Sequence, residues 1–180
     1  MADELSAGDL LLRVFESRDL YALHAIFSDP LTHTVGGGPF TSLDQTRTWL
    51  ENRRARRRQH GVAWYGLWRP DGTLVGNSGL FIGRTGNEPE FGFEVSFHHQ
   101  GKGYGTLAAQ AAIHEAHRAG FARLWATVRP SNAASLTVMR RIGFRAHHAD
   151  QDMKGELLYF NHDEDFECQV PAHHPASELS

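Results

Sequence analysis

The chain has 180 residues, the length of a single domain, and 41% of them are apolar, enough to bury a sizeable core. Its single cysteine, Cys168, excludes a scaffold held by intramolecular disulfides, and a net charge of −3 is too balanced for a general nucleic-acid binder. No apolar run approaches membrane-spanning length and the first residues are acidic, so we expect a cytoplasmic protein with no membrane partner.

Hydrophobic periodicity predicts short strands that alternate with helices. In chain order, the expected strands cover residues 11–15, 62–69, 73–82, 90–97, 121–128, 144–148 and 156–161. The expected helices cover residues 17–27, 42–59, 106–119 and 132–142. A capping box that begins at Ser42 and the turn Pro70-Asp71-Gly72 mark two of these boundaries. The pattern predicts an α/β fold with a mixed sheet, as one domain over residues 1–170 followed by a flexible tail over residues 171–180.

A glycine cluster, Gln100-Gly101-Lys102-Gly103-Tyr104-Gly105-Thr106, stands between a predicted strand and a predicted helix. Free amides at a helix N-terminus favour an anion there, and glycines let the backbone approach phosphate oxygens. The spacing does not fit a Walker A loop, and Thr106 stands where a dinucleotide fingerprint needs its third glycine. Gln100, Gly103 and Gly105 instead match the pattern Q/R-x-x-G-x-G/A. The alternative is a glycine-rich turn that binds no ligand.

Two further motifs flank this cluster. The sequence Glu90-Phe91-Gly92-Phe93 precedes it, and the segment 128–135 leads through a short helix to Gly143-Phe144. Taken in order, these motifs resemble the GNAT superfamily of N-acetyltransferases, above all its branch of ribosomal-protein N-terminal and spermidine acetyltransferases. The resemblance covers residues 64 to 144. It implies the GNAT fold, with a mostly antiparallel sheet of about seven strands and about four helices, and direct acetyl transfer from acetyl-CoA to a primary amine.

The resemblance also implies which residues bind acetyl-CoA. In this superfamily the glycine loop holds the pyrophosphate, the end of the preceding strand pairs with the pantetheine arm, and an asparagine contacts that arm. The corresponding residues are Val95, Ser96, Phe97, Gln100, Gly101, Lys102, Gly103, Tyr104, Gly105, Thr106 and Asn132. From its residue type alone, Asn132 is equally a plain helix N-cap, and the two roles are compatible.

Acetyl transfer to an amine needs a base, because a free amine is mostly protonated near neutrality. Glu90 and Glu94 lie on the same face of a predicted strand, and we expect one of them to deprotonate the amine through water. The alternative is that both face solvent. Ser135 matches the serine that this branch can use to protonate the leaving thiolate, whereas Met139 replaces a tyrosine found in other branches. The alternative for Ser135 is a local hydrogen bond.

The acceptor and the partners stay open. We expect a small-molecule or peptide amine, and a homodimer is compatible with the sequence. Five arginines (Arg53, Arg54, Arg56, Arg57 and Arg58) form a run that suits RNA or an acidic acceptor, although such runs usually form a solvated helix face. No histidine spacing fits a metal site, so we expect no metal. The alternative functions are transfer from another acyl donor, including aminoacyl-tRNA, and non-catalytic CoA sensing.

Overall fold

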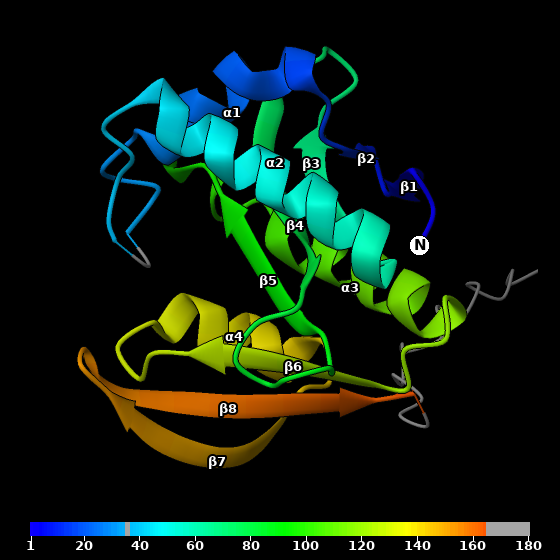
Figure 1. The fold of residues 1–180 in the computed structure, drawn as a ribbon, viewed down its shortest axis with the longest axis vertical. Helices are drawn as coiled ribbons and strands as arrows, with labels where there is room; N and C mark the ends of the chain where they lie inside the picture. The colour runs from blue at the N-terminus through cyan, green and yellow to red at the C-terminus, as the bar shows by residue number, and fades with distance from the viewer. Residues whose placement is uncertain (35–36, 165–180) are drawn as a thin grey trace, which may run out of the picture.

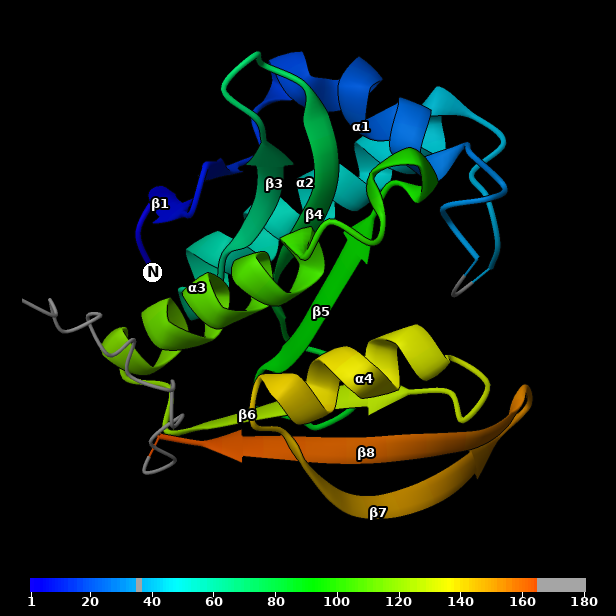
Figure 2. The same cartoon turned by 180° about the vertical axis from the view of Figure 1, so that it is seen from behind.

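The computed structural model describes residues 1–34 and 37–164, which form one mixed sheet of eight strands with helices on both faces (Figures 1 and 2). The strands are β1 (Glu4–Ala7), β2 (Leu10–Val14), β3 (Trp64–Trp68), β4 (Leu74–Phe81), β5 (Glu90–Val95), β6 (Arg123–Val128), β7 (Arg145–Asp152) and β8 (Gly155–Asp163). The helices are α1 (Leu20–Phe27), α2 (Leu43–His60), α3 (Tyr104–Arg118) and α4 (Ala133–Arg141), with short 3-10 helices η1 (Ser17–Asp19) and η2 (Phe97–His99).

The expected α/β architecture and its four helices are confirmed, and the sheet has one strand more than expected. The additional strand, β1, pairs antiparallel with β2 through a turn at Gly8, where φ is 62°. Its sequence Glu-Leu-Ser-Ala holds no β-branched or aromatic residue, so the pairing with β2 rather than local propensity makes it a strand. The capping box at Ser42 is present, and Gly61 ends α2 in the left-handed conformation. Cys168 and the predicted tail lie outside the described residues.

The strand order is β1-β2-β3-β4-β5-β6-β8-β7, and the contact between β5 and β6 is parallel whereas the other neighbours are antiparallel. These two strands are in register at one pair, Glu90 with Trp125, and then diverge, as Figure 1 shows. The Ser96 N–H donates to the Val75 carbonyl on β4 at 2.9 Å. Because main-chain groups alternate in direction along a strand, those of Val95 point away from β4, into the opening.

The two helices on one face start at this opening. Helix α3 follows β5 and α4 follows β6, so both N-termini lie at the ends where the strands have separated (Figure 2). Fully buried Ala108, Ala109, Ala112 and Ala116 let α3 lie close to the sheet. On the other face, α1 and α2 pack on Phe15, Trp64 and Trp68 through a separate cluster of apolar side chains. The opening is therefore bordered by helices on each side of the sheet.

A pair of histidines, His117 of α3 and His162 of β8, lies in contact near the end of β8. His117 Nε2 and His162 Nδ1 lie 2.9 Å apart, and His117 Nδ1 lies 2.7 Å from the Phe121 carbonyl. His162 is 6% exposed. Burial, together with the neighbouring His117, lowers the pKa of His162 to about 4. The folded protein therefore holds the neutral form of this ring at neutral pH.

This pair predicts a loss of stability in mild acid. The unfolded chain takes up the His162 proton near pH 6.5 and the folded chain only near pH 4, so the free energy of unfolding falls as the pH drops through this window. We expect a loss of about 2 kcal/mol between pH 7 and pH 5, measured by urea denaturation. His162→Asn keeps a side-chain acceptor but cannot titrate, so its stability should fall less. Equal pH slopes in the two proteins would contradict the prediction.

Candidate active site

The glycine cluster forms the turn that starts α3. Gly101 and Gly103 have φ values of 76° and 80°, and no atom lies within 4 Å of a Cβ built at either position. Helix α3 begins directly after Gly103, and its first N–H groups have no intrahelical acceptor. Residues 101–103 are exposed. The turn therefore presents free amides, the positive end of a helix dipole and the ammonium of Lys102 to an anion.

The open end of β5 lies beside this turn. The Val95 carbonyl accepts a hydrogen bond from the Gln100 side-chain amide at 3.1 Å. Gly105 contributes through close packing rather than through its conformation, because a Cβ there would lie 3.1 Å from the Phe93 ring. The structure thus brings together the predicted donor-binding residues of the segment 95–106. Three of them, Ser96, Tyr104 and Thr106, are half-buried, and Phe97 is exposed.

The other two predicted residues of this side come from the start of α4. The side-chain oxygen of Asn132 accepts a hydrogen bond from the Ser135 N–H at 3.0 Å, so Asn132 is the N-cap of the helix. Ser135 is half-buried, and its hydroxyl finds no hydrogen-bond partner among the described residues. Met139, one turn later on the same face, is buried in the core. A core side chain thus fills the position at which other branches carry a tyrosine.

The two candidate base residues have different environments. Glu90 is 2% exposed, and its carboxylate accepts hydrogen bonds from the main-chain N–H groups of Arg84 and Thr85 in the β4–β5 connection. Glu94 lies four residues along β5, about 13 Å away at 3.3 Å per residue, at the end where the strands have diverged. Its side chain is 13% exposed, so neither glutamate faces solvent. Of the two, only Glu94 lies beside Val95.

His33, which the sequence did not single out, contacts Glu94. It lies in the connection between α1 and α2, and its Nδ1 is 2.7 Å from Glu94 Oε1. The ring packs between Phe27 and Phe40, with centroid distances of 4.8 and 5.0 Å. A single histidine in a glycine-rich connection, 61 residues before its partner, carries no periodicity or spacing that could have identified it.

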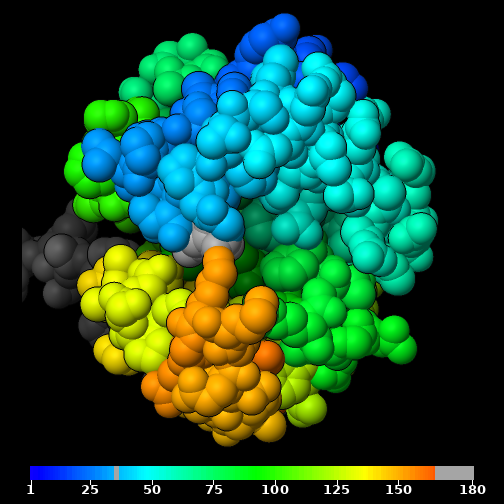
Figure 3. All heavy atoms as spheres, turned by 60° about the vertical axis from the view of Figure 1, so that its left-hand side comes forward, coloured from blue at the N-terminus to red at the C-terminus, as the bar shows by residue number. Residues whose placement is uncertain are grey.

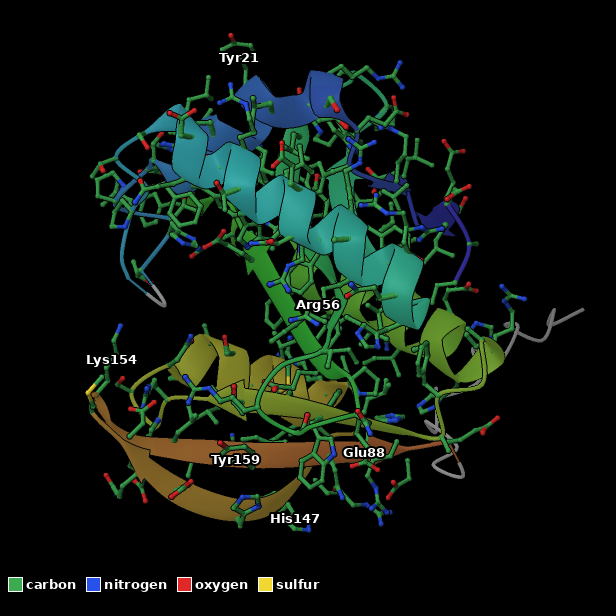
Figure 4. The ribbon with its side chains drawn as sticks, in the orientation of Figure 1. Tyr21, Arg56, Glu88, His147, Lys154 and Tyr159 are labelled. Atoms are coloured by element: carbon green, nitrogen blue, oxygen red, sulfur yellow. The ribbon has the colours of Figure 1, made fainter. Side chains whose placement is uncertain are left out.

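The arginine run of α2 divides between anchoring and exposed residues. The Arg53 guanidinium lies 4.5 to 4.9 Å from the ring centres of Trp49, Trp64 and Phe81, and its burial lowers the pKa of Arg53 to about 10. Arg54 donates a hydrogen bond to the Ser17 hydroxyl at 2.7 Å. Arg57 donates to the Asp3 carboxylate at 2.6 Å and to the Met1 carbonyl at 3.1 Å. Arg56 and Arg58 are exposed (Figure 4 labels Arg56).

Figure 4 labels three polar residues from the β4–β5 connection and the C-terminal strands: Glu88 of that connection, Tyr159 of β8 and Lys154 at the tip of the β7–β8 hairpin. The space-filling view in Figure 3 is hollowed between the residues that lead into α2 and this hairpin. Among the described residues, no group of three or more His, Cys, Asp or Glu side chains could hold a metal ion. None of the helices in that part of the chain has the length and apolar character needed to cross a membrane.

Comparisons with known proteins agree with this fold. A family model described as an acetyltransferase (GNAT) domain matches residues 9–145. YkkB, an uncharacterized protein of Bacillus subtilis, is 29% identical over 145 residues, which are 78% of this chain and 84% of YkkB. An acetyltransferase from Agrobacterium tumefaciens has a TM-score of 0.79 at 25% identity, over 91% of this chain and 96% of that one. RimL, a ribosomal L7/L12 alpha-N-protein acetyltransferase solved with coenzyme A, has a TM-score of 0.78 at 18% identity, over 89% of this chain and 97% of RimL.

The fold and the site define an acyl-transferring enzyme: a mixed sheet opens between two parallel strands, and the glycine-rich turn that starts α3 lies at the opening. The family match covers most of the chain, from residue 9 to residue 145. The chain belongs to the GNAT family of acetyltransferases.

Proposed function

We propose that the protein transfers an acetyl group from acetyl-CoA to a primary amine, by direct attack of the amine within a ternary complex. The observation that carries this proposal is the position of the α3 turn, whose free amides lie beside the open main-chain edge of β5. Coenzyme A combines a pyrophosphate with an amide-bearing arm, and these two groups match an anion site and an unpaired strand edge. The coenzyme A complex of RimL, which shares the fold, supports this donor class.

The residues of the donor side have separable roles in this proposal. The backbone of residues 100–106 and the ammonium of Lys102 hold the pyrophosphate. The main chain of Val95 to Phe97 pairs with the arm, and Asn132 contacts it while it caps α4. The thioester, when bound, supplies the activated carbonyl carbon. The fit rests on Gly101 and Gly103, where side chains would enter space that the structure leaves open.

The reaction needs two proton transfers. The amine nitrogen attacks the thioester carbon, the new C–N bond forms, and the C–S bond breaks as the nitrogen loses a proton. We place the base at the Glu94 end of β5 because the Glu90 carboxylate already accepts hydrogen bonds from main-chain N–H groups of the β4–β5 connection. The Ser135 hydroxyl, at the start of α4, protonates the leaving thiolate.

The proposal is tested with wild-type protein, acetyl-CoA and a panel of amines: spermidine, an aminoglycoside, an arylalkylamine and a peptide with an N-terminal serine. CoA release is followed with a thiol reagent, and the product is identified by the added mass of one acetyl group. Acetylation of at least one amine supports the proposal. Calorimetry that detects no acetyl-CoA binding overturns it, and binding without turnover on any amine favours the sensor function.

Ser135→Ala is expected to slow acetylation by about 10- to 100-fold with little change in the Kd for acetyl-CoA, because a general acid acts on the transition state. Thr137→Ala is the matched control, since it removes a hydroxyl from the same helix that bonds the Ala133 carbonyl at 2.9 Å. Steady-state rates and calorimetry separate the two effects. A Ser135→Ala variant with the rate of the wild type would show that Ser135 is not the general acid.

A further inference from the structure

We infer that His33 is the general base of this reaction: its Nε2 takes the proton from the acceptor amine, and Glu94 orients the ring. The inference rests on the proposed function, which left the proton acceptor at the Glu94 end of β5 unspecified. It deepens that proposal by naming the atom that receives the proton. The assignment rests on hydrogen bonds that connect four side chains from different parts of the fold: His33, Glu94, Asn77 and Trp64.

The contact between His33 and Glu94 fixes which ring nitrogen carries the proton. His33 Nδ1 lies 2.7 Å from Glu94 Oε1, and an ionised carboxylate can only accept hydrogen bonds. The neutral ring therefore holds its proton on Nδ1 and leaves the lone pair on Nε2. Within residues 1–34 and 37–164, Nε2 has no hydrogen-bond partner. A carboxylate that holds the Nδ1 proton of a histidine is the arrangement by which hydrolases prepare their general base.

Glu94 is itself held by a chain of hydrogen bonds. Asn77 lies directly opposite Glu94 in the β4–β5 register, and its side-chain amide donates to Glu94 Oε2 at 3.4 Å. The Trp64 indole N–H donates to Asn77 Oδ1 at 3.0 Å, which fixes the orientation of that amide. Both carboxylate oxygens of Glu94 thus have a partner. In this hydrogen-bonded network, Nε2 of His33 is a ring nitrogen that has no partner within residues 1–34 and 37–164.

The connection that carries His33 is tied to the end of β5. The Phe97 N–H donates to the Thr32 hydroxyl at 2.8 Å, and Thr32 donates to an Asp29 carboxylate oxygen at 2.5 Å. His33 therefore lies beside the open strand end at which the donor arm is proposed to bind. Its side chain is 12% exposed, so the ring is largely shielded from bulk water.

The charged and titratable groups named around His33 come from β5, from η2 and from its own connection. Glu94 faces it from β5, and Asp29 lies four residues earlier in the same connection. Phe27 and Phe40, from α1 and the segment before α2, contribute no charge. His98 of η2 is a further titratable group, and it interacts with Asp29. The amine proton moves to Nε2 as the C–N bond forms, and the Glu94 carboxylate stabilises the resulting cation.

The first test measures the ring itself. Long-range ¹H–¹⁵N spectra report the tautomer of each histidine, and His33→Gln identifies the signals of His33. We expect the Nδ1–H form in the wild type. In Glu94→Gln, the fixed Asn77 amide binds the new side-chain oxygen, so the new NH₂ group must face His33 Nδ1 and forces the proton onto Nε2. An Nε2–H ring in the wild type would overturn the inference.

The second test measures the reaction with the amine that the panel identifies. His33→Gln is expected to lower kcat by about 10²- to 10⁴-fold with an unchanged Kd for acetyl-CoA, and Glu94→Gln by a similar factor through the wrong tautomer. The acid limb of the pH–rate profile should disappear in His33→Gln. His24→Gln is the matched control, because His24 is a half-buried histidine of α1 that bonds Thr46 at 2.8 Å.

The outcomes separate the two proposals. If the wild type acetylates an amine and His33→Gln keeps both its rate and its acid limb, the base assignment is wrong and the proposed function stands. If the wild type binds acetyl-CoA but acetylates no amine, the proposed function and the assignment both fail. Should His33→Gln fold poorly, Glu94→Gln and the wild-type tautomer still decide the question.

Discussion

Gly103→Glu is expected to weaken acetyl-CoA binding by about 100-fold, equivalent to roughly 3 kcal/mol. Gly103 is the N-cap of α3 and its φ is 80°, so a glutamate side chain would enter the open space in front of the helix. Its carboxylate would then occupy the position proposed for the pyrophosphate and oppose a second negative charge. Calorimetric titration with acetyl-CoA measures the loss directly.

Gly120→Glu is the control for this experiment. Gly120 also has a positive φ, 91°, with no atom within 4 Å of an added Cβ, and it follows the other end of the same helix. Both variants carry the same cost, about 1–2 kcal/mol, of a left-handed residue with a side chain. The 15-residue helix α3 is about 22 Å long, so these two positions, which flank its opposite ends, are well separated. Equal affinities in the two variants would place the donor elsewhere.

Much of the fold could be predicted because local signals define it. The capping box at Ser42 and the glycine-rich start of α3 appear in the sequence as they do in the structure. The strand β1 could not be predicted, because its pairing with β2 supplies what its own residues lack. The predicted strand 90–97 ends two residues early, at Val95, because residues 97–99 turn into η2. Pairing with neighbouring strands thus determines whether a segment forms a strand where its local propensity is weak.

The donor side of the site was more predictable than the acceptor side. Residues 95–106 are contiguous, so their order along the chain already placed them together. His33 and Glu94 are 61 residues apart and meet only because the connection between α1 and α2 folds back onto the end of β5. Asn77 and Trp64 join the same network from two more strands. No local pattern in a single sequence predicts contacts between residues this far apart along the chain.

The arginine run shows why charge patterns alone are ambiguous. Arg53 lies within the run, yet its guanidinium is enclosed by the rings of Trp49, Trp64 and Phe81. Burial lowers the pKa of Arg53 only to about 10, so it keeps its charge at neutral pH. The buried carboxylate of Glu90 is a favourable electrostatic neighbour for this cation. Glu90 and Arg53 therefore belong to the interior of the fold, which has a measurable consequence.

Glu90→Ala is expected to lower the free energy of unfolding by about 2–4 kcal/mol, measured by urea denaturation. The substitution leaves the main-chain N–H groups of Arg84 and Thr85 without their buried acceptor and removes a negative charge that interacts favourably with Arg53. Glu90→Gln keeps an oxygen that can accept these hydrogen bonds, so we expect it to retain more than half of the lost stability and to acetylate at a rate close to that of the wild type. A stable Glu90→Gln variant with a rate lowered more than 100-fold would instead make Glu90 the base and would remove both Glu94 and His33 from the proton transfer.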